Sequence, residues 1–168
     1  MPRRLIDRCR PDSIHEFRAA ARQRYDDGLA LAAAGNRTSA IYLWGYTAEM
    51  TLKAGYFAFI GFGETDPIDV RRDINPAIDR GRALRVAWPH RGQGHNVRAW
   101  AELLVAERSA APGDPFTPSF ARQVQSCGQR IQQLWNETLR YHKNRAYLHE
   151  VRQVREAASW LLANSEEL

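Results

Sequence analysis

Cysteine is scarce in this chain of 168 residues, which contains only Cys9 and Cys127, 118 positions apart. That separation does not have the spacing of a metal-ligating pair, and two cysteines cannot form the disulfide framework on which small secreted domains depend. A chain of this length buries enough surface to fold without a disulfide or a metal. We therefore expect a reduced, cytoplasmic protein.

Long apolar runs are also missing. The longest, residues 54–62, has nine residues, whereas a membrane-spanning helix needs about 20. The N-terminal residues 1–12 are basic but lack the apolar stretch of a secretory signal. We expect no membrane segment, and we divide the chain into a basic N-terminal tail (1–12) and one domain (13–168).

The motifs of several common enzyme classes are absent. There is no phosphate-binding Gly-x-x-x-x-Gly-Lys-Ser/Thr loop, no Gly-x-Ser-x-Gly nucleophile elbow, and no Glu-x-x-His pair of the kind that di-iron bundles use twice. The histidines are too scattered to suggest a zinc site; they are His15, His90, His95, His142 and His149. The sequence therefore predicts no metal and no cofactor.

Lysine is rare, since 22 of the 24 basic residues are arginine. Residues 71–100 contain seven arginines and two acidic residues, so this segment carries all of the formal charge of +5. Two interpretations are open: a cationic surface for a phosphate-bearing partner, or a solvated face whose arginines reflect a GC-rich genome.

No alternating β-type pattern occurs, and apolar residues recur at helical intervals along the chain. Ser13 and Glu16 have capping-box spacing, Asn96 can cap a helix, and Pro76 suits a first turn. The sequence predicts an all-α protein, a single antiparallel bundle of five to six helices. Helices are expected over 13–34, 38–59, 77–86, 96–108, 119–138 and 148–163, with loops over 61–75 and 111–118.

The helix expected over 38–59 carries two charges in apolar surroundings. Its apolar stripe is Ile41, Trp44, Ala48, Leu52 and Gly55. Glu49 and Lys53 lie four positions apart, in the favourable order for an intrahelical ion pair. This pair is either solvated, or partly buried against a partner such as an arginine.

His95 lies at the expected start of a helix, where the helix dipole disfavours its cationic form. We expect a neutral imidazole that bonds neighbouring backbone; the alternative is a hydrogen-bond donor that lines a cleft.

Basic and aromatic residues are densest over 139–149. Aromatic rings stack on bases and cations hold phosphates, which is how proteins bind single-stranded RNA and nucleotides. The alternative is a junction between helices in which Arg140 is tied to a buried carboxylate.

These patterns together resemble the HEPN superfamily of helical-bundle proteins. The resemblance covers roughly residues 15–163 and depends on fragments that occur in the family's order: Ala40-Ile41-Tyr42-Leu43, Gly45-Tyr46-Thr47-Ala48-Glu49, Leu52-Lys53, Gly94-His95-Asn96-Val97, Leu103-Leu104, Trp135, Leu139-Arg140-Tyr141 and Trp160-Leu161-Leu162.

The resemblance implies a bundle that often forms a homodimer. It also implies one of three roles: a metal-independent ribonuclease, a non-catalytic RNA or nucleotide binder, or a partner of a small nucleotidyltransferase in toxin–antitoxin or defence systems. The residues that match recurrent polar positions of the binding-type branch are Glu49, Lys53, His95, Arg140 and Tyr141.

The ribonuclease branch has an arginine followed by a histidine, with four to six residues between the two. This chain departs from that pattern, because only Lys143-Asn144 has the right separation from His149, and Arg145 is too close to it. A lysine supplies charge without the bidentate fork of arginine. The sequence therefore favours the binding-type branch. The alternatives are a ribonuclease that uses His149 with Lys143 or Arg145, and a purely structural oligomeric module.

Overall fold

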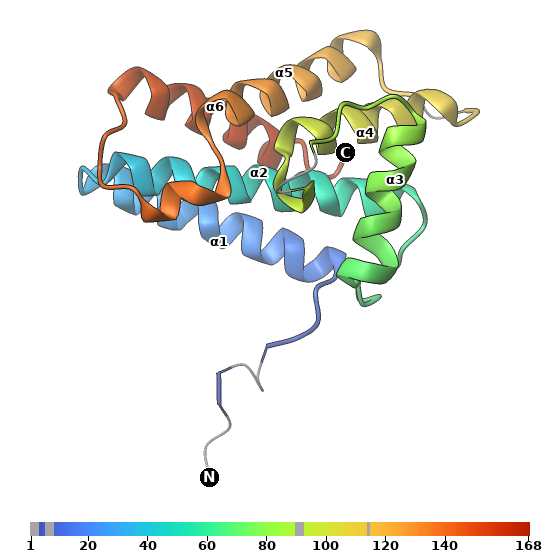
Figure 1. Cartoon of the computed structure of the whole chain (residues 1–168), viewed down its shortest axis with the longest axis horizontal. Helices are drawn as coiled ribbons and strands as arrows, with labels where there is room; N and C mark the ends of the chain where they lie inside the picture. Colours follow the sequence, from blue (N-terminus) through green and yellow to red (C-terminus); the bar gives the residue numbers. More distant parts are fainter. Residues whose placement is uncertain (1–3, 6–8, 90–92, 114) are drawn as a thin grey trace.

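A computed structural model describes residues 4–5, 9–89, 93–113 and 115–168, and these residues form six α-helices and no strand (Figure 1). The all-α prediction is confirmed. The helices are α1 (Ile14–Ala33), α2 (Arg37–Phe59), α3 (Asn75–Ala83), α4 (Val97–Ala110), α5 (Pro118–Leu134) and α6 (Leu148–Ala163). Three short elements are the π-helix η2 (Val70–Ile74) and the 3₁₀ helices η3 (Gln93–His95) and η4 (Glu137–Tyr141).

The helix starts follow from local chemistry. The Ser13 side chain accepts a hydrogen bond from the Glu16 amide at 3.2 Å, and Asn96 Oδ1 accepts one from the Ala99 amide at 2.7 Å. Each bond satisfies an amide that the first turn of a helix leaves without a partner. Pro118 opens α5, where its missing N–H costs nothing.

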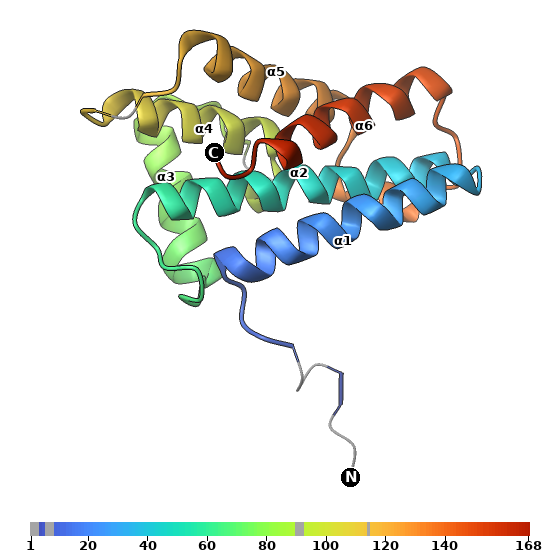
Figure 2. The same ribbon diagram turned by 180° about the vertical axis from the view of Figure 1, so that it is seen from behind.

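Helix α2 is the centre of the bundle. It packs against α1, α4, α5 and α6, and 15 of its 23 residues are buried. Figures 1 and 2 show α1 and α2 side by side, with α5 and α6 on the other side of α2 and α3 running across their ends. A helix that is covered nearly all round must accommodate any charge it carries inside the protein. No helix of the described residues has the length and apolar character needed to span a membrane.

Two predicted elements differ in extent. Residues 70–74, expected to belong to a loop, form η2, in which the Asp69 side chain caps the amides of Arg71 and Arg72. The helix expected over 77–86 starts earlier and ends at Ala83, because Arg85 takes a left-handed conformation (φ 64°) and the Val86 amide bonds back to the Gly81 carbonyl. His90, Arg91 and Gly92 lie outside the described residues.

Helix α5 ends at Leu134, so the prediction that it reaches Thr138 is wrong. Trp135 is extended and fully buried, and its indole Nε1 donates to the Tyr42 carbonyl at 2.9 Å. Burial of this large side chain under α2 outweighs continuation of the helical pattern. Thr138 lies in η4, whose start Asn136 caps.

Candidate functional site

A buried ion pair lies in the middle of α2. Lys53 Nζ donates to Glu49 Oε1 at 2.6 Å, and the two side chains are only 7% and 4% exposed. The ammonium also lies 5.4 Å from the centre of the Trp100 ring, on its face. The interpretation of a solvated surface pair is therefore wrong. Two charges at this depth need close partners to offset their desolvation.

His95 is the third member of this group. Its Nδ1 lies 3.0 Å and 3.2 Å from the two carboxylate oxygens of Glu49. The hydrogen bond to Glu49 raises the pKa of His95 above its ordinary value, against the opposing effect of burial. The His95 Nδ1 therefore bonds the Glu49 carboxylate and not neighbouring backbone, and the partner of Glu49 is this histidine and not an arginine. The group of Glu49, Lys53 and His95 is called the Glu49 cluster below.

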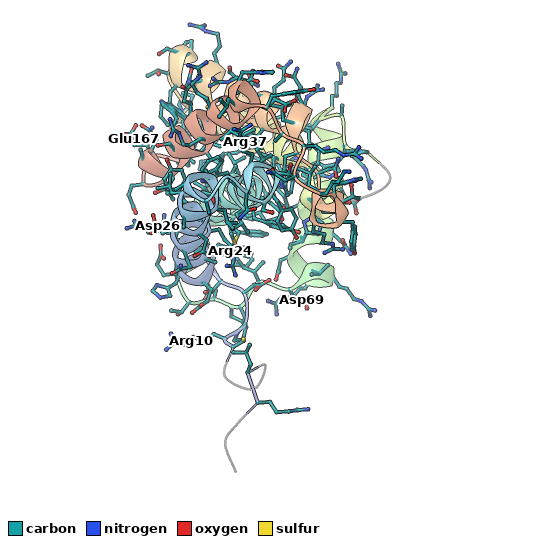
Figure 3. The ribbon with its side chains drawn as sticks, turned by 90° about the vertical axis from the view of Figure 1, so that its left-hand side faces the viewer. Arg10, Arg24, Asp26, Arg37, Asp69 and Glu167 are labelled. Atoms are coloured by element: carbon teal, nitrogen blue, oxygen red, sulfur yellow. The ribbon has the colours of Figure 1, made fainter. Side chains whose placement is uncertain are left out.

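The Glu49 cluster opens onto a groove of about 710 Å³. Its walls come from α1, α2, η2, η3 and residues 9–12, and the His95 side chain is 43% exposed. In Figure 3, Arg24, which lines the groove, points to the side of α1 on which Asp69 lies, whereas Asp26 points to the opposite side. The groove contains charges of both signs, so it has no strong preference for an anion or a cation.

A row of aromatic rings connects the Glu49 cluster to Arg140. The Tyr46 ring makes edge contacts with His95, Trp135 and Tyr42, at centroid distances of 6.0, 5.3 and 5.0 Å. Burial, followed by its hydrogen bond with Tyr42, raises the pKa of Tyr46, which therefore stays protonated. The five residues chosen from the sequence as ligand-binding thus lie along one connected path.

Arg140 lies at the outer end of that path. Its guanidinium is 4.7 Å from the Tyr141 ring centre, and hydrogen bonds with Tyr141 and then Tyr42 raise the pKa of Arg140. The alternative in which Arg140 is tied to a buried carboxylate is therefore wrong. Tyr42 and Tyr46 were missed by the sequence analysis. Their spacing with Glu49 and Lys53, steps of four, three and four, is the signal that could have identified them.

The cations of the Arg-rich segment and those of residues 140–145 differ in their partners. In the Arg-rich segment 71–100, most described arginines pair with carboxylates within 3.0 Å: Arg72 with Asp73, Arg80 with Glu107, Arg82 with Asp79, and Arg98 with Glu102. In contrast, the described residues place no carboxylate within 4.0 Å of the side-chain nitrogens of Arg140, Lys143 or Arg145. In the described part of the chain, residues 140–145 therefore bring together three cations with no carboxylate within 4.0 Å, and exposed arginines elsewhere, such as Arg122, Arg152 and Arg155, also have none.

The three residues considered for catalysis do not line one groove. Lys143 and Arg145 line a second groove, of about 240 Å³, between the start of α2 and residues 139–147. His149 is exposed and stacks on Tyr147, with ring centres 5.8 Å apart and planes at 9°. His149 is not among the residues that line either groove.

No group of three or more His, Cys, Asp or Glu side chains in the described part of the chain is arranged to hold a metal ion. Comparisons of the chain with protein-family models, with curated proteins and with solved structures find no match.

Proposed function

We propose that this chain is a HEPN-like domain that binds single-stranded RNA or a nucleotide through residues 140–147, without cleaving it. The observation that supports this proposal is the set of unpaired cations Arg140, Lys143 and Arg145 beside the exposed rings of Tyr141 and Tyr147, which are 73% and 67% exposed. Arginines that already bind carboxylates, such as Arg80, would have to break those contacts first.

This arrangement suits an anionic polymer with flat rings. Unpaired cations gain from phosphate contact because the nucleic acid releases condensed counterions, and exposed tyrosine rings stack on bases of any sequence.

The Glu49 cluster would have a positioning role in this function. Through Tyr46 and Tyr42 it is connected to Arg140, and the Glu49–His95 contact holds η3 against α2. The resemblance to HEPN proteins adds three further proposals: a homodimer, a nucleotidyltransferase partner, and a place in a toxin–antitoxin or defence system.

The experiment is a salt titration of RNA binding. A fluorescently labelled single-stranded RNA is titrated with the full chain at 50 mM and 200 mM salt, and anisotropy gives the Kd. Three phosphate contacts predict that the Kd rises about 20-fold between these salt concentrations, and Arg140→Ala should reduce that rise to about 7-fold.

The matched control is Arg98→Ala, which removes a cation that is already paired with Glu102. It should leave the affinity and the salt dependence unchanged. Equal loss of affinity in the two variants would contradict the assignment of the surface, and no RNA binding by the wild-type chain would refute the function.

A further inference from the structure

The groove between the start of α2 and residues 139–147 has an interior lined by side chains to which the proposed function gives no role. Its floor is apolar, and comes from Ile41, Leu134, Leu139 and Ala146. Its rim carries His142, Lys143 and Arg145, and the Glu150 carboxylate lies in its wall. An apolar floor with a cationic rim suits a ligand that is flat and apolar at one end and anionic at the other.

The wall of this groove is held firmly to α2. Thr38 Oγ1 accepts hydrogen bonds from the Arg145 and Ala146 amides at 2.8 Å and 3.0 Å. Asn144 Oδ1 accepts from the Thr38 amide at 3.1 Å, and Asn144 Nδ2 donates to the Gly35 carbonyl at 2.8 Å. These four bonds connect residues more than 100 positions apart, so the groove is preformed. Binding of a ligand therefore requires little additional ordering of the chain.

Thr38 also has an unused hydrogen-bond donor. A hydroxyl has two lone pairs and one proton, and the Arg145 and Ala146 amides use both lone pairs. Thr38 is 6% exposed and lines the groove, and the described residues supply no acceptor for its O–H. A buried donor without a partner is costly unless water or a ligand accepts its proton.

Glu150 supplies the complementary acceptor. One of its oxygens, Oε2, accepts the Tyr147 amide at 2.7 Å, which fixes the side chain at the start of α6. A carboxylate has further lone pairs, and these can accept N–H groups of a ligand. The groove therefore offers one donor and one charged acceptor inside a cationic rim.

The volume limits what can enter. The groove, of about 240 Å³, is smaller than the roughly 300–1,000 Å³ of pockets that enclose drug-sized ligands. It has room for one ring system, so the sugar and phosphate of a nucleotide would stay at the rim, beside Lys143 and Arg145.

We infer that this groove holds one nucleobase that carries an exocyclic amino group, with the amino group donating to Glu150 and a ring nitrogen or carbonyl accepting from Thr38. This inference depends on the proposed function and specifies its base preference. Adenine, cytosine and guanine present amino donors. Uracil is disfavoured, because its one N–H lies between two carbonyl oxygens that would face the carboxylate.

The test is a competition experiment with the full chain. The 5′-monophosphates of adenosine, cytidine, guanosine and uridine compete with labelled single-stranded RNA at 50 mM salt, and the half-displacing concentrations are compared. The first three should displace the RNA at roughly tenfold lower concentration than the uridine nucleotide, as expected for a hydrogen bond to a charged group.

Glu150→Gln should remove this preference, since an amide donates to the uracil carbonyls as well as accepting. The side-chain oxygen of the glutamine variant can still accept the hydrogen bond from the Tyr147 backbone amide. Glu156→Gln is the matched control, because Glu156 is an exposed glutamate on the same helix that does not line this groove. The Glu156→Gln variant should prefer the three amino-bearing nucleotides over the uridine nucleotide to the same extent as the wild type.

A second variant, Ala146→Phe, fills the groove from its floor. It should abolish competition by all four nucleotides while the salt dependence of RNA binding persists. Circular dichroism melts establish that each variant is folded.

The outcomes separate the two proposals. Equal competition by all four nucleotides, or a preference that Glu150→Gln leaves intact, overturns the base pocket while RNA binding stands. Absence of RNA binding in the wild-type chain overturns both.

Discussion

Glu49 and His95 are 46 positions apart in the chain, yet the histidine Nδ1 lies 3.0 Å from Glu49 Oε2. The same carboxylate accepts from Lys53, one turn further along α2. One buried acid therefore balances a buried ammonium and holds η3 against α2. The behaviour of this group can be measured separately from any ligand.

Removing the acid should destabilise the fold strongly. Glu49→Ala leaves the Lys53 ammonium buried without its partner, and we expect a loss of about 3–5 kcal/mol in the free energy of unfolding, measured by urea denaturation. The double variant Glu49→Leu/Lys53→Met, which removes both charges, should be clearly more stable than the single variant.

The control for this prediction is Glu102→Ala, which breaks the more exposed pair with Arg98. It should cost less than about 1 kcal/mol. A similar cost for Glu49→Ala and Glu102→Ala would show that the position of the Glu49 pair inside α2 has no energetic consequence.

The His95–Glu49 contact predicts a pH dependence of stability. The folded-state pKa of His95 is raised above the ordinary value of 6.5. Protonation therefore favours the folded state: this contribution is fully present below about pH 6.5 and is lost as the pH rises through the folded-state pKa.

Urea denaturation of the wild type and of His95→Gln at several pH values from 5 to 9 measures this effect. The stability difference between the two should be largest at acid pH and should shrink as the pH rises. A difference that stays constant, or grows with pH, would contradict the assigned contact.

Gly45 allows α2 to pack closely against Trp135. A Cβ atom at this position would overlap the buried indole ring. Gly45→Ala should therefore cost about 1–3 kcal/mol and displace the start of η4, which weakens RNA binding as well. Gly94→Ala, where a Cβ meets nothing within 4 Å, should leave RNA affinity unchanged in the same assays.

Thr38 fastens residues 145–146 to α2 through its hydroxyl. Thr38→Val keeps the shape but removes the acceptor of two backbone amides, and we expect a loss of roughly 1–2 kcal/mol. Thr38→Ser keeps the hydroxyl and should lose less. Amide hydrogen exchange should show faster exchange at Arg145 and Ala146 in the valine variant alone.

The absence of cleavage is tested with single-stranded RNA in EDTA. We expect no cleavage products from the wild-type chain, because His149 does not line the groove that Lys143 and Arg145 line. Chelator-insensitive cleavage that disappears in a folded His149→Ala variant would instead establish the ribonuclease alternative, with a lysine where that branch has an arginine.

The sequence alone determined the features that depend on neighbours along the chain. The caps by Ser13 and Asn96, Pro76 in the first turn of α3 and the apolar stripe of α2 all depend on residues within a turn or two of one another. These interactions have fixed spacings, so the all-α class and most of the helix starts could be predicted.

Only the tertiary structure decided which charges are available and which are buried. Arg80 is neutralised by Glu107, 27 positions away, and Glu49 reaches His95 across 46. Trp135 ends α5 because its indole finds the Tyr42 carbonyl, 93 positions away. Such partners share no spacing in the sequence, since packing of the helices against α2 brings them together.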